Sequence, residues 1–231
     1  MTSVHALKGV SFDIYRGEVI ALLGVNGAGK TTLSSILATL HPATDGDILF
    51  NGDSIYNNIS AYRSALGYCP QRANLDQELT VKQNLFFAGK YFLLPDDVLH
   101  SRVAELLEIF ELKKYADFHT AQISGGYKQR LLIARAIIHK PQIVIMDEPT
   151  IALDPNVRRQ IWDQIQKLKE QGITVIITTH YLDEAEILSD RVCILHEGKI
   201  LLIDKSENLK QQFQKKNLEE VFLHLTQEEA Q

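Results

Sequence analysis

The sequence GVNGAGKTT, residues 24–32, decides the fold of this chain. It matches the pattern G-x-x-x-x-G-K-[ST] of a phosphate-binding loop at Gly24, Gly29, Lys30 and Thr31. Glycine at these points lets backbone N–H groups approach phosphate oxygens closely, because no Cβ stands in the way. A helix that begins at this loop adds its free N–H groups and the positive end of its dipole. The stretch therefore predicts a site for the phosphates of a nucleotide.

The segments on either side of this loop fit a strand–loop–helix unit. Residues 19–23 form a continuous apolar run, as in a strand buried on both faces, and residues 32–40 have the pattern of a helix. In such a unit the Lys30 ammonium reaches the β- and γ-phosphates, and the Thr31 hydroxyl is a ligand of Mg²⁺. We expect the other loop residues to surround the phosphates; they are Gly24, Val25, Asn26, Gly27, Ala28, Gly29 and Thr32.

Composition limits the possible classes of protein. With 231 residues, 45% of them hydrophobic, the chain can form one large domain or two small ones. A net charge of −5 gives no support for nucleic-acid binding by the whole surface.

Cys69 and Cys193 lie far apart and in no C-x-x-C pattern, which indicates buried thiols in a reducing compartment. No apolar run approaches the roughly 18 residues that a membrane span needs, and the N-terminus lacks the apolar core of a signal peptide. We therefore expect a soluble, cytosolic protein.

Strand and helix patterns alternate along the chain, which predicts an α/β fold with a mainly parallel sheet. The expected strands are residues 11–15, 19–23, 47–50, 65–68, 143–146, 174–179, 192–195 and 200–203. The expected helices are residues 32–40, 81–90, 103–110, 126–139, 155–171, 182–189 and 218–225. Glu197 and Gly198 are expected to form the turn of a hairpin. Residues 72–140 have mainly helical patterns, so we interpret them as a helical insertion between strands of the nucleotide-binding sheet.

Polar side chains follow three of the expected strands. Asp147 and Glu148 emerge at a strand's carboxyl end, the edge at which open parallel sheets place ligands. Asp147 suits the acidic Mg²⁺ position, reached directly or through water, and Glu148 could polarise an attacking water. Gln71 could hold Mg²⁺ or that water, and His180 could donate a hydrogen bond to the γ-phosphate. For each of these two residues the alternative is an ordinary turn or cap at the end of a strand.

A second glycine-rich helix start is Ser124-Gly125-Gly126. Chemically it is a second anion site, because a helix N-terminus offers free N–H groups and a positive dipole end. The alternative is an ordinary serine N-cap, which the pattern alone favours. A second phosphate clamp on a separate helical lobe makes sense if two copies of the chain hold a nucleotide between them.

Taken together, these motifs resemble those of the ATP-binding cassette family, the ATPase subunits of ABC transporters, over nearly the whole chain. The matching stretches are the Walker A loop at 24–31, the Q-loop Gln71, the signature at 123–127, Walker B at 143–147, the catalytic base Glu148, the D-loop at 151–154 and the switch His180. Residues 179–186 and 218–223 further resemble the ABC-2-type exporter branch.

The resemblance implies a P-loop NTPase core of the RecA-like type with an antiparallel β subdomain and a helical signature lobe. It assigns residues 1–71 and 141–215 to the core, 72–140 to the lobe and 216–231 to a C-terminal helix or tail. It implies ATP and Mg²⁺ as cofactors. The catalytic residues it implies are Glu148, His180, Lys30 and Gln71, the metal ligands are Thr31, Gln71 and Asp147, and the residues contacting the γ-phosphate of a partner copy are Ser124 and Gly126.

The same resemblance predicts the partners. We expect a homodimer, or a heterodimer with a second cassette, that forms on ATP binding and drives integral membrane permease subunits. The protein would then lie peripherally on the cytoplasmic face of the cell membrane, with no nucleic acid expected as a partner. The alternative within the family is a soluble ATPase acting on ribosomes or DNA, which usually carries two cassettes or a long coiled-coil insertion. A GTP-dependent switch would need an N-K-x-D motif, which the chain lacks, and intact Glu148 and His180 argue against an inactive module.

Three departures from the family pattern accompany the resemblance. Tyr127 replaces the usual signature glutamine, and Ile151 replaces a small hydroxyl residue of the D-loop, which removes one hydrogen bond expected across the dimer. The aromatic residue that stacks on adenine in the family precedes the first strand, and this sequence begins too late to contain it. We expect either a natural segment ahead of Met1 or weaker base stacking.

Overall fold

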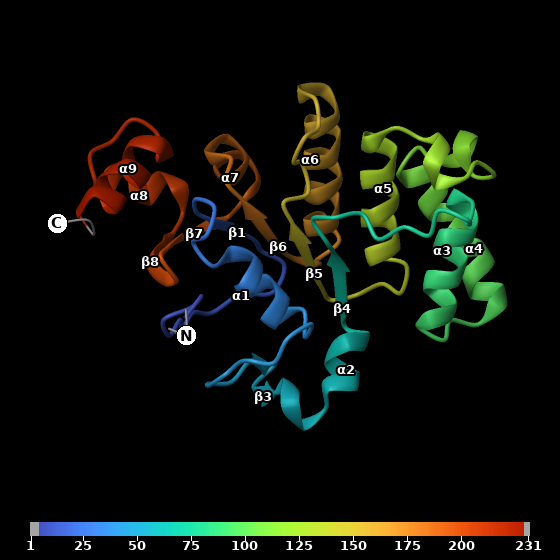
Figure 1. The fold of residues 1–231 in the computed structure, drawn as a ribbon, viewed down its shortest axis with the longest axis horizontal. Coiled ribbons are helices and arrows are strands. Elements are labelled where there is room, and N and C mark those ends of the chain that lie inside the picture. Colours follow the sequence, from blue (N-terminus) through green and yellow to red (C-terminus); the bar gives the residue numbers. More distant parts are fainter. Residues whose placement is uncertain (1–4, 229–231) are drawn as a thin grey trace, which may run out of the picture. The chain divides into compact units, whose positions relative to one another are not determined.

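The computed structural model describes residues 5–228. The chain divides into two compact units, one made of residues up to Gly46 and from Leu168 onward, the other of Asp47–Lys167. Each unit has its own group of strands. Figure 1 shows the helices and strands of both, coloured along the sequence.

The first unit contains four strands in the order β6-β1-β7-β8. They are β1 (Val19–Leu23), β6 (Thr174–Thr179), β7 (Arg191–His196) and β8 (Lys199–Asp204). Strand β1 runs parallel to β6 on one side and to β7 on the other, whereas β7 and β8 form an antiparallel hairpin. All five side chains of β1 are buried, which explains why its sequence is apolar throughout rather than alternating.

The helices of the first unit cover these strands. They are α1 (Lys30–Leu37), α7 (Leu182–Leu188), α8 (Ser206–Gln212) and α9 (Leu218–Glu228). Helix α1 packs on β6, and α7 packs on β1 and β6. In Figure 1 these two helices lie on opposite faces of the strands, and α8 and α9 lie side by side beyond β8. Leu209 of α8 and Val221 of α9 are fully buried, so the tail packs as part of this unit.

The second unit has two pairs of strands. The parallel strands β4 (Leu66–Cys69) and β5 (Ile143–Asp147) pair with Cys69 opposite Met146. The short strands β2 (Leu49–Phe50) and β3 (Asp53–Ser54) form an antiparallel hairpin around Asn51 and Gly52, both of which have positive φ. The 3-10 helix η1 (Ile55–Asn57) and helix α2 (Ile59–Ser64) connect β3 to β4.

Three long helices make up the insertion predicted between β4 and β5. They are α3 (Val81–Tyr91), α4 (Asp96–Ile109) and α5 (Gly125–Ala136), with the short 3-10 helices η2 (Lys113–Tyr115) and η3 (Thr120–Gln122) between α4 and α5. Figure 1 shows the three side by side, α3 packing on both α4 and α5. The predicted apolar stripe of Val103, Leu106, Leu107 and Phe110 is buried. After β5, helix α6 (Pro155–Glu170) begins at the proline predicted for its first position.

Two of the predicted strands differ from the structure. Residues 11–15 pair with no strand among the described residues. The Tyr15 N–H, for example, donates to the Glu18 carboxylate at 2.7 Å and not to the carbonyl oxygen of a neighbouring strand. The strand predicted at 47–50 is reduced to Leu49–Phe50, since the Ile48 amide donates to its neighbour Asp47. Helices α2 and α8 were not predicted. Within residues 5–228 no helix is both long and apolar enough to cross a membrane.

Candidate nucleotide site

The predicted phosphate loop connects β1 to α1 in the first unit. Gly27 and Gly29 take up left-handed φ angles of 86° and 105°, which side chains with a Cβ rarely adopt. Gly29 is the N-cap of α1, and Lys30 and Thr31 are its first two residues. The amide groups of the first turn therefore open onto the loop, as anion binding at a helix N-terminus requires.

The Lys30 ammonium reaches back across this loop. Its Nζ donates to the Gly24 carbonyl oxygen at 2.7 Å and to the Val25 carbonyl oxygen at 3.2 Å, and the residue is only 5% exposed. These bonds span the mouth of the loop and hold the positive charge inside it. The ammonium is therefore placed where phosphate oxygens would meet it.

Strand β7 and the β7–β8 turn form one wall of the loop. A Cβ on Gly24 would lie 2.5 Å from the Leu195 carbonyl oxygen, so only glycine fits at this position. At the other end of the loop, the Gly198 amide donates to the Ala28 carbonyl oxygen at 3.0 Å. The sequence predicts the hairpin but carries no signal that its turn contacts the loop, because the two segments are about 170 residues apart.

In the second unit, Gln71 and Glu148 lie together. The Gln71 Nε2 donates to the Glu148 Oε2 at 3.0 Å. The pairing of Cys69 with Met146 explains the contact, since Gln71 and Glu148 each lie two residues further, beyond the carboxyl ends of parallel strands. Glu148 is 8% exposed and has a φ of 47°, an uncommon backbone conformation for a residue with a Cβ, as found at functional sites.

Asp147 is the last residue of β5 and is almost fully buried. Its charge affects the neighbouring strand. Burial raises the pKa of the Tyr68 hydroxyl to about 12, and the Asp147 carboxylate adds to this increase. Burial likewise raises the pKa of the Cys69 thiol to about 12, again with a contribution from Asp147, so this cysteine is a buried thiol as predicted. The carboxylate is therefore a source of negative charge at this strand end, which suits a cation ligand.

His180 follows β6 in the first unit. Because Leu23 pairs with Thr179 in parallel register, Gly24 and His180 leave two neighbouring strands at the same edge. The Thr179 hydroxyl accepts the Tyr181 amide at 3.0 Å, and the His180 and Tyr181 rings lie 4.2 Å apart. The phosphate loop and the predicted switch histidine thus share one edge of the first unit.

The predicted signature lies at the start of α5 in the second unit. Ser124 is the N-cap residue, but among the described residues its hydroxyl accepts no capping hydrogen bond, and the residue is exposed. No described atom lies within 4 Å of a Cβ built on Gly125. A Cβ on Gly126 would come within 2.8 Å of the Val157 Cγ1, so helix packing requires this glycine. The ordinary serine cap is therefore not formed.

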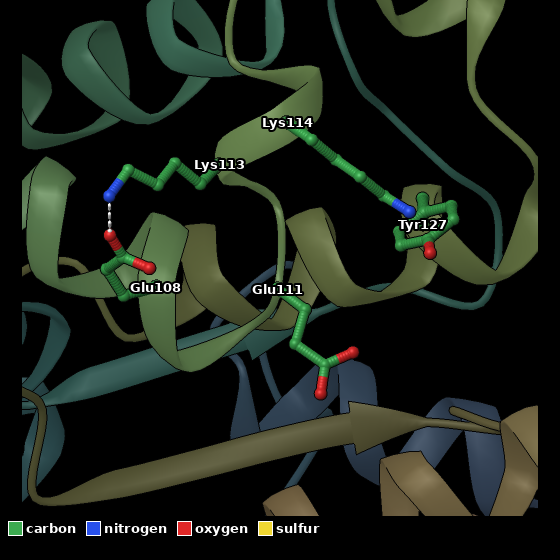
Figure 2. Close-up of a pocket in the computed structure, with 5 residues that line it drawn as sticks. All are labelled: Glu108, Glu111, Lys113, Lys114 and Tyr127. Carbon is green, nitrogen blue, oxygen red and sulfur yellow. Dashed lines mark hydrogen bonds and ion pairs between the residues drawn. The ribbon is translucent and has the colours of Figure 1, made fainter.

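Tyr127 lies in the first turn of α5 and lines a hollow of about 470 Å³. Figure 2 shows its lining residues, with the Lys114 side chain extended towards the Tyr127 ring. The Lys114 ammonium is 4.9 Å from the Tyr115 ring centre and 5.4 Å from that of Tyr127, and hydrogen bonds to both tyrosines raise its pKa. Lys113 pairs with Glu108 at the rim. The replacement for the usual glutamine is therefore held by a cation–π contact rather than by amide hydrogen bonds.

The structure brings the predicted site residues together in three groups. The first unit holds the loop residues 24–32 with His180 at the same sheet edge. The second unit holds Gln71, Asp147 and Glu148 at one strand edge, and the exposed signature at the start of α5. The union of these groups in one catalytic site stays a prediction. Among residues 5–228 no group of three or more His, Cys, Asp or Glu side chains could hold a metal ion by itself.

Comparison with known proteins identifies the family. A family model described as "ABC transporter" matches residues 7–151, more than half of the chain. The chain belongs to the ABC transporter family. Two curated relatives are Nod factor export ATP-binding protein I of Rhizobium sp. (strain N33), 41% identical over 195 residues, and the protein of the same name from Sinorhizobium fredii (strain NBRC 101917 / NGR234), 40% identical over 190 residues. These matches cover 84% and 82% of this chain but 64% and 55% of the relatives.

Solved structures of this family share the fold. An ATP-binding subunit of an ABC transporter superposes with a TM-score of 0.86 at 31% identity, covering 96% of this chain and 93% of that chain. A dimeric ATP-binding cassette in a post-hydrolysis state, bound to ADP and Pi, superposes with a TM-score of 0.80 at 29% identity, covering 87% and 91%. The chain is thus an ATP-binding cassette with an α/β P-loop NTPase fold, as the motifs predict.

The residues present fit ATP and Mg²⁺ chemically. The loop is a glycine cradle, in which no described atom lies within 4 Å of a Cβ built on Gly27, and a side chain at Gly24 or Gly29 would collide with its walls. Lys30 supplies the positive charge that phosphates require. The predicted metal ligands Thr31, Gln71 and Asp147 each carry a side-chain oxygen, the type of donor that Mg²⁺ prefers.

Proposed function

We propose that this chain is the ATP-binding and ATP-hydrolysing subunit of an ABC exporter. The observation that carries the proposal is the hydrogen bond between Gln71 and Glu148 beside Asp147, at the carboxyl ends of two parallel strands. This arrangement is what metal-assisted attack of water on a phosphate needs: a carboxylate to accept a proton, an amide to orient the water and a second carboxylate for the metal.

The roles follow from the chemistry of each side chain. Bound Mg²⁺ would neutralise charge on the β- and γ-phosphates, held by Thr31, Asp147 and Gln71. Glu148 would accept a proton from the attacking water, and Lys30 would bind the β- and γ-phosphates. His180 would donate a hydrogen bond to the γ-phosphate. Catalysis would come mainly from positioning and electrostatics, because phosphoryl transfer needs little covalent chemistry from the protein.

The signature would complete the site of a second copy. Ser124 and Gly125 are exposed, and the Ser124 hydroxyl makes no capping bond among the described residues, so the α5 N-terminus can receive an anion from outside. The solved cassette bound to ADP and Pi is dimeric, which supports the same assembly here. In this dimer Ser124 and Gly126 of one copy face the γ-phosphate bound by the other.

The partner that uses this energy would be a membrane permease. The relatives are named as export ATP-binding proteins, which supports export as the direction of transport. Because the chain spans less than two thirds of these relatives, the identity of the cargo does not transfer with the name. The subunit would lie on the cytoplasmic face of the membrane, bound to its permease.

The experiment that tests hydrolysis is Glu148→Gln. The glutamine keeps the shape and the contact with Gln71 but cannot accept a proton, and loss of a general base typically lowers the rate by about 10²–10⁴-fold. We expect phosphate release to fall by this factor in a malachite-green assay, while Mg·ATP binding in calorimetry stays within about twofold. The ATP-bound variant should accumulate as a dimer in size-exclusion chromatography with light scattering.

Asp163→Asn is the matched control, because it makes the same carboxylate-to-amide change at an exposed position in the middle of α6. It should keep the rate of phosphate release. Near-normal hydrolysis by Glu148→Gln would remove Glu148 from the mechanism.

A further inference from the structure

The turn between β7 and β8 contacts the phosphate loop directly. Its two residues, Glu197 and Gly198, have φ angles of 44° and 81°, so both lie in the left-handed region typical of a tight two-residue hairpin. Gly198 is buried although it lies at the tip of a hairpin. The contact that buries it belongs to the nucleotide site.

The backbone of Gly198 joins three segments of the first unit. Its N–H donates to the Ala28 carbonyl oxygen at 3.0 Å, and its carbonyl oxygen accepts from the Lys8 N–H at 2.8 Å. The turn therefore lies between the N-terminal segment and the last part of the phosphate loop, hydrogen-bonded to both.

The bond to Ala28 fixes the direction of a peptide group in the loop. A trans peptide points its C=O and its N–H to opposite sides. Because the Ala28 C=O points to the turn, the N–H of the next residue, Gly29, points away from the turn. The amides of this loop are the groups that bind phosphate, so the turn holds one of them in its binding orientation.

Steric contacts support the same arrangement. A Cβ on Gly198 would lie 2.6 Å from the Ala6 carbonyl oxygen and 3.2 Å from the Leu7 Cα. A Cβ on Gly29 would lie 2.8 Å from the same Ala6 oxygen. The two glycines thus pack against one backbone wall, and any side chain at Gly198 must displace either that wall or the turn.

We propose that Gly198 is a positioning residue for nucleotide binding, which holds the Ala28–Gly29 peptide of the phosphate loop in its phosphate-binding orientation. The inference rests on the proposed function of the loop. It predicts that the nucleotide affinity depends on a residue of the β7–β8 turn, outside every motif recognised in the sequence.

The test compares Gly198→Ala with Gly172→Ala. Gly172 also has a left-handed φ, 78°, but no described atom lies within 4 Å of its Cβ, so it measures the cost of backbone strain alone. Both variants should lose thermal stability. Only Gly198→Ala should raise the Kd for Mg·ATP, by about tenfold or more, the effect expected from losing one charge-assisted hydrogen bond to phosphate.

Calorimetry on the folded fraction and differential scanning fluorimetry give the two readouts. Equal Mg·ATP affinity in both variants, at comparable stability, would overturn the proposal, since a merely structural turn would lower stability without changing Kd. If the wild-type chain itself binds no Mg·ATP, the proposed function fails instead, and the two failures are thereby distinguished.

A measurement on the wild-type protein covers the case in which Gly198→Ala does not fold. With ¹⁵N-glycine labelling, the Gly198 amide should exchange slowly with solvent without nucleotide, and its resonance should shift together with that of Gly29 when Mg·ATP is added. The Gly172 resonance should stay in place. Rapid exchange of the Gly198 amide, with a resonance that does not shift when Mg·ATP is added, would contradict the proposal.

Discussion

Two glycine-rich helix starts in this chain have the same local chemistry and opposite surroundings. The loop before α1 is closed by its own unit, with Leu195 against Gly24 and Ala6 against Gly29. The start of α5 is open, because Gly125 has no described atom within 4 Å of its Cβ and Ser124 is exposed. Both ends present free amide groups to an anion, but backbone of its own unit encloses the first, whereas among the described residues the second has the Val157 side chain against Gly126 and an open face at Gly125.

The difference indicates how each start meets a phosphate. A loop whose peptides are fixed by neighbouring backbone can bind nucleotide by itself, because the ordering is already done before binding. An open helix start without such walls binds an anion weakly in water, so it needs a partner that brings the phosphate and excludes solvent. This contrast supports the proposal that α5 acts on the nucleotide of a second copy.

The largest expected effect on nucleotide binding comes from a substitution in the enclosed loop before α1. In Gly29→Ala the new Cβ meets the Ala6 oxygen and the Leu7 Cδ2 at below 3 Å, at a φ of 105°. Because this collision would displace the Gly29 amide from the phosphate, and a hydrogen bond to a charged group is worth about 1.5–3 kcal/mol, we expect the Kd for Mg·ATP to rise about a hundredfold in calorimetry. Gly46→Ala is the control, with a φ of 85° and no described atom within 4 Å; it should keep the affinity. Equal affinities in the two variants would show that the close contacts of Gly29 with Ala6 and Leu7 do not affect nucleotide binding.

The next largest effect, on hydrolysis, should come from blocking the exposed start of α5. Ser124→Arg places bulk where the γ-phosphate of a partner copy would dock, so hydrolysis should fall by about 10- to 100-fold, on the scale of losing one hydrogen bond to a charged group. Binding of Mg·ATP to the monomer should stay unchanged, because the phosphate loop is intact. Phosphate release and calorimetry measure the two quantities. Normal hydrolysis with normal dimerisation would show that α5 does not serve the nucleotide.

Mixing variants sharpens this test. When Ser124→Arg chains are mixed with Lys30→Ala chains, a mixed dimer has one site with both an intact loop and an intact signature. Hydrolysis should then exceed the sum of the separate variants. If each chain used its own signature, every site would carry one defect and mixing would restore nothing. A negative result is checked by light scattering, to confirm that mixed dimers form.

The smallest effect should come from Gly125→Ala. The site is open and on the first turn of a helix, where a single surface substitution changes stability by about 0.5 kcal/mol or less. We expect the Mg·ATP affinity of the single chain and its melting temperature to stay near their wild-type values. A loss of binding as large as in Gly29→Ala would show that the two helix starts are equivalent after all.

Much of this protein follows from local sequence. The apolar run of β1 and the helical patterns that begin at residues 81 and 155 each mark an element where the structure has it. These signals work because capping, strand burial and proline act over a few residues. The prediction of a strand at residues 11–15 was wrong, because their burial alternates as expected but none of the described strands pairs with them.

What only the tertiary structure decided lies between segments far apart in the chain. The motifs determined the family, the phosphate loop and the strand-end polar residues from their own chemistry. Only the folded chain shows the hydrogen bond between Gln71 and Glu148. The same holds for the contacts of the phosphate loop with Leu195 and Gly198. The physical reason is range: a glycine in a sequence permits a close approach of another backbone, but only the folded chain shows which distant backbone makes that approach.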